Sequence, residues 1–196
     1  MPFLWAAVAC FGIFLFFGLL LLLVLAVILL AMALFFRHPI RDYSPSSSSL
    51  YSPADGRVAD ITEADGITTV GIFLSVFDVH IVKAPSDVTI TGQDYQRGKF
   101  LHAGSEGAKS KNERLIMTLH SDTYGAFKVT LLAGAIARKI VSAVSNGDNV
   151  PQFGELGLIR FGSRVECTIP PQMQVDVSVG DRTYGGLTPL ASVKQA

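Results

Sequence analysis

The chain reads Leu115-Ile116-Met117-Thr118-Leu119 and, a few residues later, Phe127-Lys128-Val129-Thr130-Leu131-Leu132. Short apolar runs of this kind, rich in β-branched residues and interrupted by polar ones, are typical of strands in a half-buried sheet. Similar runs occur at Gly71–Phe77, Val88–Thr91 and Val175–Val179. Turn-forming pairs lie between the runs, at Asp55-Gly56, Asp65-Gly66, Asn146-Gly147 and Gly180-Asp181. The sequence therefore predicts a mainly β domain, with at most one helical turn in Val76–Val82.

The end of the chain suggests which β architecture to expect. Residues 175–191 read as a strand, a tight turn and a second strand. This pattern resembles the edges of barrel-sandwich lipoyl and biotinyl modules, although no lysine occupies the hairpin tip in a modification motif. We therefore expect a β-sandwich or barrel-sandwich domain.

The N-terminal segment has a different composition. No Asp, Glu, Lys, Arg or His occurs from Met1 to Phe36, although 16% of the chain is charged. A helix needs about 20 apolar residues to cross the hydrocarbon layer of a bilayer, so Phe14–Phe36 predicts one transmembrane helix. Met1–Ile13 extends this helix, lies in the membrane interface, or forms a short hairpin with it.

Flanking charges indicate whether this segment is a cleaved signal peptide and how it is oriented in the membrane. A secretory signal peptide has a positive start and an apolar region of about 7–15 residues, whereas this start carries no charged side chain. Arg37 and Arg41 follow the span, and positive residues tend to remain on the cytoplasmic side. We therefore expect residues 1–41 to anchor the chain in the cell membrane, with the domain that follows on the cytoplasmic side.

The rest of the chain divides into a linker and a domain. Residues 42–50 are Ser-rich and predict a flexible linker, so residues 51–196 are expected to form the domain. The formal net charge of +0 argues against a strongly electrostatic nucleic-acid binder. Cys10 lies in the membrane segment and Cys167 in the domain, so neither a disulfide nor a zinc site is expected.

Three segments carry side chains suited to catalysis, although each also has an ordinary structural explanation. Asp55 lies in a turn, where Asp is common. His80 lies between Asp78 and Lys83 in an otherwise apolar run, which also suits a polar strand end. Gly162-Ser163 on its own is a step that occurs by chance in most proteins.

Taken together and in order, the segments resemble the proenzymes of the phosphatidylserine decarboxylase family, in particular their short branch. The resemblance extends from Phe35 to Ala191. The matching stretches are Phe35-Phe36-Arg37 with Pro39 and Arg41, Ser52–Val58, Ile72–Ser75, Phe77–His80, Gly98–Phe100, Asn112–Arg114, Ala133-Gly134, Ala137-Arg138 and Gly157–Arg164.

The resemblance implies self-cleavage between Gly162 and Ser163. The Ser163 hydroxyl attacks the Gly162 carbonyl, where glycine offers the least steric obstruction. Elimination of the resulting ester frees a chain of residues 1–162 and leaves dehydroalanine, and hydrolysis then gives ammonia and a pyruvoyl group at position 163. That group forms a Schiff base with the substrate amine, so neither a metal nor pyridoxal phosphate is expected.

The resemblance also implies roles for the neighbouring residues. His80 is the base that activates Ser163 and Asp55 is the carboxylate that orients it, and His80 has a possible second role in protonating the product. Longer family members carry a second His where this chain has Lys83, so Lys83 either shares the catalysis or, as we prefer, binds the lipid phosphate. Substrate-binding candidates with a guanidinium fork suited to phosphate or carboxylate are Arg138, Arg160 and Arg164.

The expected activity is conversion of phosphatidylserine to phosphatidylethanolamine and carbon dioxide in phospholipid biosynthesis. Archaetidylserine is an alternative substrate, and the sequence does not separate the two lipids. A non-catalytic, membrane-tethered β module is the rival from another class, and a serine hydrolase is a weaker one because Gly-x-Ser-x-Gly is absent around Ser163. We expect the two cleaved chains, 1–162 and 163–196, to stay associated, and a homodimer would cover exposed sheet edges.

Overall fold

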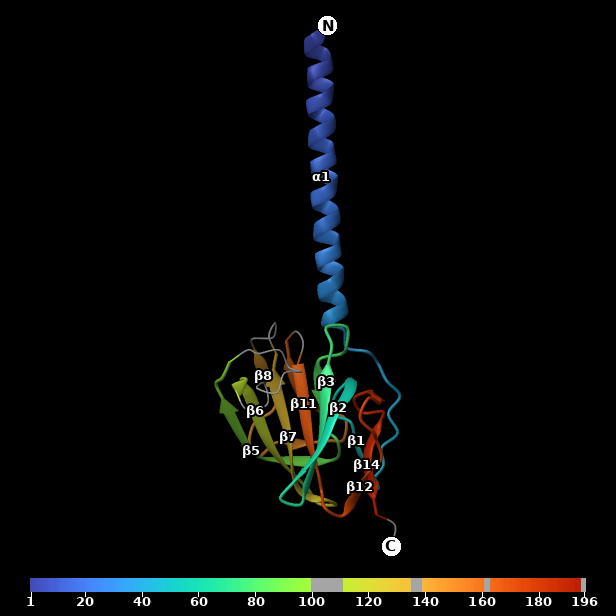
Figure 1. The fold of residues 1–196 in the computed structure, drawn as a ribbon, viewed down its shortest axis with the longest axis vertical. Helices are drawn as coiled ribbons and strands as arrows, with labels where there is room; N and C mark the ends of the chain where they lie inside the picture. The colour runs from blue at the N-terminus through green and yellow to red at the C-terminus, as the bar shows by residue number, and fades with distance from the viewer. Residues whose placement is uncertain (100–110, 135–138, 161–162, 195–196) are drawn as a thin grey trace. The chain divides into compact units, whose positions relative to one another are not determined.

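The computed structural model describes residues 1–99, 111–134, 139–160 and 163–194, with the side chains of residues 2 and 6–9 excepted. The chain divides into two compact units, Met1–Arg37 and His38–Ala196. The first unit is helical and the second consists of strands and loops (Figure 1). The predictions of a mainly β domain and of an N-terminal apolar helix are therefore confirmed.

The first unit contains one helix, α1, which spans Pro2–Phe35 without interruption. Its 34 residues correspond to about 50 Å at 1.5 Å per residue, more than the roughly 30 Å of a bilayer's hydrocarbon core. Gly12 and Gly18 lie inside the helix, so the hairpin alternative is not what the structure shows. The apolar stretch Phe3–Phe35 is long and apolar enough to cross a membrane, which fits membrane association.

The described residues of the second unit form fourteen strands. They are β1 (Ser49–Tyr51), β2 (Gly56–Ala64), β3 (Ile67–Leu74), β4 (Ile81–Lys83), β5 (Val88–Gln96), β6 (Arg114–Ser121), β7 (Gly125–Ala133), β8 (Ile140–Ser142), β9 (Asn149–Val150), β10 (Glu155–Ile159), β11 (Ser163–Ile169), β12 (Met173–Val175), β13 (Arg182–Thr183) and β14 (Pro189–Val193).

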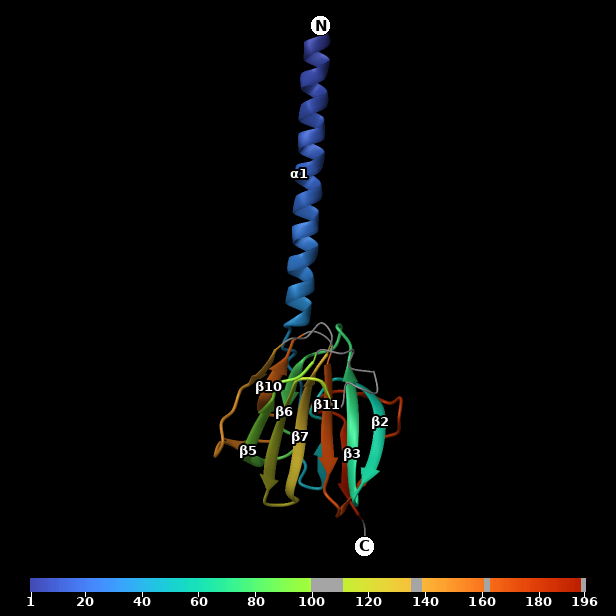
Figure 2. The ribbon, with the colours of Figure 1, turned by 60° about the vertical axis from the view of Figure 1, so that its left-hand side comes forward.

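The strands form one large sheet and two small ones. The large sheet has eight strands in the order β13-β2-β3-β11-β7-β6-β5-β9, and it curls strongly (Figure 2). The small sheets have the orders β4-β10-β8 and β1-β14-β12. Strand β11 lies in the middle of the large sheet, antiparallel to both β3 and β7.

Local sequence signals account for the turns. Asp65 and Gly66 have φ values of 52° and 74°, as in the two-residue hairpin turns that Asp-Gly favours. The expected strand Val175–Val179 is wrong beyond its first residue, because β12 ends at Val175 and the Ser178 N–H binds the Asp181 carboxylate at 2.8 Å. The expected helical turn in Val76–Val82 is likewise replaced by a tight turn and strand β4.

Burial in the large sheet changes along the strands. Near one end, consecutive residues are buried, as in Leu131–Ala133 on β7 and Ser163–Val165 on β11, whereas β2 and β11 alternate or become exposed toward the other end. Leu74, the last residue of β3, is also fully buried. The sheet is therefore covered on both faces at the end where β11 begins.

Cys167 on β11 provides a direct test of this core. It is fully buried, and the loss of hydration raises the pKa of its thiol to about 12. In a Cys10→Ser variant we expect iodoacetamide at pH 8 to leave the native protein unmodified and to label Cys167 after unfolding. Because the folded pKa exceeds the ordinary 9.0, the free energy of unfolding should fall by up to about 1.4 kcal/mol per pH unit above that value. Rapid labelling of the native protein would contradict this packing.

Candidate active site

Ser163 is the first residue of β11 and is held from both sides. It is the register partner of Leu74 on β3 and of Ala133 on β7. The residue is fully buried, and its Oγ has no hydrogen-bond partner among the described residues. An unsatisfied buried hydroxyl is uncommon and costly. Packing alone does not explain why a hydroxyl without a described partner is buried at the site of the expected self-cleavage. The other residue of that site, Gly162, lies outside the described residues.

His80 lies near the same end of the sheet. Leu74, which pairs with Ser163, is followed by the turn that leads to His80, and the carbonyl of His80 accepts the N–H of Ile159 at 3.2 Å. The imidazole is fully buried, and its Nδ1 lies 2.8 Å from the carbonyl oxygen of Asp78. A carbonyl oxygen only accepts, so Nδ1 carries the proton in this contact, and in the neutral form of the ring the lone pair would lie on Nε2.

The carboxylate of Asp78 fixes the turn that carries His80. It accepts the N–H of Ser75 at 2.7 Å and the hydroxyl of Ser75 at 2.8 Å, and it also pairs with Arg182. Only 2% of the Asp78 side chain is exposed. Sequence reasoning did not find this role, although Ser75-x-x-Asp78 is a pattern in which a carboxylate can close a local turn.

Asp55 lies just before β2, at the same end of the sheet. Arg57 on β2 pairs with Phe73 on β3, so Asp55 precedes β2 where β3 ends. A Cβ on the intervening Gly56 would lie 2.3 Å from the carbonyl oxygen of Phe73, so only glycine allows this close approach. The strand pairing therefore brings Asp55, His80 and Ser163 to one end of the domain.

Asp55 forms a buried ion pair with Arg41. Two guanidinium nitrogens of Arg41 donate to the two carboxylate oxygens at 2.7 Å each. The side chains are 11% and 7% exposed, respectively. The hydrogen bond to Asp55 raises the pKa of Arg41 above its ordinary value. Arg41, expected only as a flanking positive charge, is thus part of the second unit's interior.

Lys83 is not exposed as a lysine in an open phosphate-binding site would be. It is buried, and its Nζ donates to the carbonyl of Phe153 at 3.2 Å and lies 5.3 Å from the centre of the Tyr43 ring. The rings of Tyr43 and Phe153 stack with centroids 4.7 Å apart. This ammonium is stabilised by a carbonyl and an aromatic face.

The three candidate arginines differ in position. Arg164 is buried and its guanidinium binds Asp60 at 2.7 Å and Glu166 at 2.8 Å, so it links β11 to β2 across β3 rather than presenting an open anion site. Arg160 is exposed, and Arg138 lies outside the described residues.

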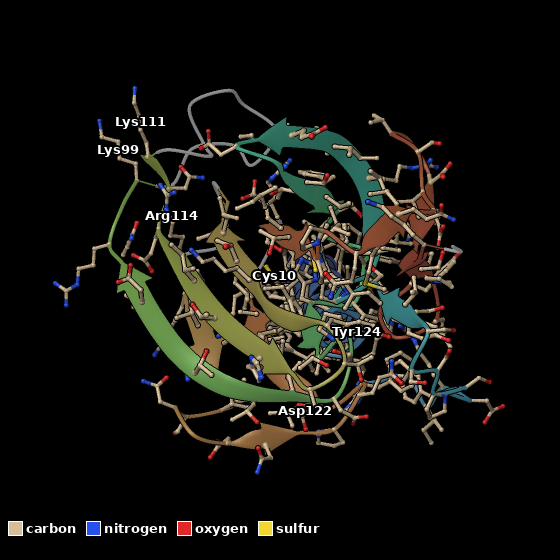
Figure 3. All side chains as sticks on the ribbon, turned by 90° about the horizontal axis from the view of Figure 1, so that it is seen from below. Cys10, Lys99, Lys111, Arg114, Asp122 and Tyr124 are labelled. Atoms are coloured by element: carbon tan, nitrogen blue, oxygen red, sulfur yellow. The ribbon has the colours of Figure 1, made fainter. Side chains whose placement is uncertain are left out.

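Two lysines that the sequence reasoning left unassigned also lie near this end. The N–H of Lys99 donates to the carbonyl of Lys111 at 2.6 Å, and Glu113, two residues on, binds Ala133, the partner of Ser163. Both lysines extend outward beside Arg114 (Figure 3). Both are exposed positive charges, and Lys111 lies three residues before β6, the strand that pairs with β7.

The Ser-rich segment 42–50 contacts the domain. The N–H of Ser46 binds the side-chain oxygen of Gln152 at 3.1 Å, Tyr124 donates to the carbonyl of Ser47, and β1 begins at Ser49. These contacts attach the segment to the β unit at several points. Among the described residues, no group of three or more His, Cys, Asp or Glu is arranged to hold a metal ion.

Comparisons with known proteins show which family the chain resembles. A family model described as phosphatidylserine decarboxylase matches residues 28–191. A phosphatidylserine decarboxylase proenzyme of Saccharopolyspora erythraea is 38% identical over 174 residues, which cover 84% of this chain and 74% of the relative. One of Streptomyces avermitilis is 41% identical, covering 79% and 70%. A protein of Methanosarcina mazei, provisionally named an archaetidylserine decarboxylase proenzyme, is 39% identical, covering 83% and 76%.

Proposed function

Because this chain belongs to the phosphatidylserine decarboxylase family, we propose that it cleaves itself before Ser163 and uses the pyruvoyl group so formed to decarboxylate its lipid. The chain is a decarboxylase proenzyme of phospholipid biosynthesis that converts phosphatidylserine to phosphatidylethanolamine. Archaetidylserine carries the same serine headgroup, and a relative named for it is as similar as those named for phosphatidylserine. The headgroup, rather than the tails, is what the proposed site must recognise.

The observation that carries the proposal is the buried hydroxyl of Ser163, which has no hydrogen-bond partner in the described part of the chain. A Ser163 Oγ that is not committed to another hydrogen bond is available to attack the carbonyl carbon of Gly162. The C–N bond is exchanged for an ester, and β-elimination then breaks the ester Cβ–O bond and releases the Gly162 carboxylate. Hydrolysis of the remaining dehydroalanine releases ammonia. Residue 163 thus fits as the precursor of a pyruvoyl group.

His80 is the proposed base for the attack. Because Nδ1 is bound to the Asp78 carbonyl, Nε2 is the ring nitrogen that we assign to take the Ser163 proton, and burial keeps water from competing for it. Asp55 remains the proposed carboxylate of the site. Its described hydrogen bonds go to Arg41 and Gly185, so in our proposal it contributes a fixed negative charge near the imidazole, while the Asp78 carbonyl sets the ring orientation.

After cleavage, a ketone at residue 163 would supply the electron sink for loss of carbon dioxide. The buried positions of Leu74, Ala133 and Ser163 would exclude water from the reacting carbon. Arg160, Lys99 and Lys111 are exposed cations near this end that could bind the lipid phosphate. Lys83 would have to leave Phe153 and Tyr43 to do so, and we therefore place it second.

The remaining parts of the proposal concern assembly. The chain 163–196 would stay bound to 1–162 because β11 pairs with a strand on each side in the large sheet. We propose a cell-membrane location with the domain on the cytoplasmic side, on the charges that follow α1. A homodimer gains no support from the sheet edges, because β9 and β13 have only two residues each.

The test is an assay of the full chain in liposomes that contain phosphatidylserine. Wild type should release carbon dioxide and form phosphatidylethanolamine, and an aminooxy probe, which captures ketones, should label the small chain. Ser163→Ala should do neither. Release of carbon dioxide by Ser163→Ala at the wild-type rate would contradict the proposal, and no release by a folded wild type would favour the tethered β module. Liposomes of archaetidylserine, run in parallel, distinguish the two lipids.

A further inference from the structure

The segment Arg182–Gly185 lies beside the candidate active site but belongs to the part of the chain after Ser163. Strand β13 pairs with the start of β2, with Arg182 opposite Arg57 and Thr183 opposite Gly56. The hydroxyl of Thr183 donates to the carbonyl of Ala54 at 3.2 Å. The segment thus runs directly alongside the backbone that presents Asp55.

One end of this segment holds the Asp55 ion pair. The N–H of Gly185 donates to the Asp55 carboxylate at 2.8 Å, and the carbonyl of Gly185 accepts from Arg41 at 2.7 Å. A single residue therefore satisfies both partners of the pair. The Asp55 carboxylate and the Arg41 guanidinium are therefore both bound to this segment as well as to each other.

The other end of this segment holds the turn that carries His80. The guanidinium of Arg182 pairs with the buried Asp78 carboxylate and lies 5.5 Å from the centre of the Tyr184 ring. The carbonyl of the same Asp78 accepts the bond from His80 Nδ1. Arg182 therefore reaches the imidazole only indirectly, through Asp78. None of its described contacts is with Ser163.

We propose that Arg182–Gly185 is a clamp that fixes the backbone presenting Asp55 relative to the turn carrying His80. In this clamp, Arg182 is a positioning residue for His80. This inference rests on the proposed function, in which His80 activates Ser163. Without the guanidinium, the buried Asp78 carboxylate would keep, within the described ranges, its two bonds from Ser75, and the turn could shift to expose the charge. A shift of about 1 Å in a catalytic base can cost on the order of a hundredfold in rate.

The first experiment follows self-cleavage of freshly made full-length chain by intact mass. Arg182→Gln should slow cleavage by about tenfold to a hundredfold, and Arg182→Lys should recover part of the rate by restoring a cation beside Asp78. Arg57→Gln is the matched control, since Arg57 lies opposite Arg182 but donates to the carbonyl of Gly180. All variants are compared at a temperature where circular dichroism shows them folded.

The second experiment separates the clamp from self-cleavage. In the uncleavable Ser163→Ala chain, nitrogen NMR of labelled histidine reports whether the His80 proton sits on Nδ1, with assignment by His80→Asn. We expect that tautomer in the parent and a loss of it with Arg182→Gln but not with Arg57→Gln. An unchanged His80 signal together with equal cleavage of the two glutamine variants would overturn the clamp. If wild type never cleaves, the proposed function fails, and the NMR comparison still decides the clamp.

Discussion

Replacing His80 with alanine is expected to slow self-cleavage by a factor of about 10² to 10⁴, the usual contribution of a positioned general base. The prediction follows from the geometry of the imidazole, whose Nδ1 is committed to the Asp78 carbonyl, so that Nε2 is the nitrogen we assign as the base. The measurement is the fraction of full-length chain remaining over time, determined by intact mass.

An exposed histidine provides the control for this experiment. His120 lies on β6 near its far end, opposite Ala126, and is exposed. His120→Ala should therefore cleave at the wild-type rate. If His80→Ala also cleaves at that rate while folded, another group activates Ser163 and the assignment of His80 is wrong.

Replacing Arg41 with glutamine is expected to destabilise the β unit by about 3–5 kcal/mol, the usual cost of breaking a buried ion pair from one side. The change would leave the Asp55 carboxylate, whose side chain is 7% exposed, with the N–H of Gly185 as its described donor. For a domain of this size the loss corresponds to a fall in Tm of roughly 6–20 °C. Thermal unfolding followed by circular dichroism measures it.

Two further variants show whether the ion pair causes this loss. Arg160→Gln removes an exposed arginine and should change Tm little, because surface substitutions usually stay within about 0.5 kcal/mol. Adding Asp55→Asn to Arg41→Gln removes the stranded charge and should restore part of the stability. Equal Tm values for Arg41→Gln and Arg160→Gln would show that the pair contributes nothing to stability.

Much of the fold could be predicted from local sequence. The apolar segment gave α1, and the runs around Leu115 and Phe127 became β6 and β7, because period and composition are local properties of strands and helices. The prediction of a strand at Val175–Val179 was wrong beyond Val175 because alternating apolar and polar residues also occur in extended loops. Here the Asp181 side chain, rather than a neighbouring strand, binds the Ser178 N–H.

The candidate site was only partly predictable. Family resemblance drew attention to Asp55, His80 and Ser163, and strand register accounts for their meeting at one end of the sheet. The contacts of Arg41 with Asp55 and of Arg182 with Asp78 could not be read from sequence, because each joins residues whose distance depends on the whole sheet. The contact of Arg164 with Asp60 could not be read from sequence either, whereas Glu166 lies only two residues along the same strand.

The most direct test of the account is the intact mass of the purified protein under denaturing conditions, for wild type and for Ser163→Ala. The account predicts two chains from wild type, divided after Gly162, with the smaller carrying the mass of a pyruvoyl group in place of serine at its start. It predicts one uncut chain from Ser163→Ala. A folded, mature wild type that remains a single unmodified chain would contradict it.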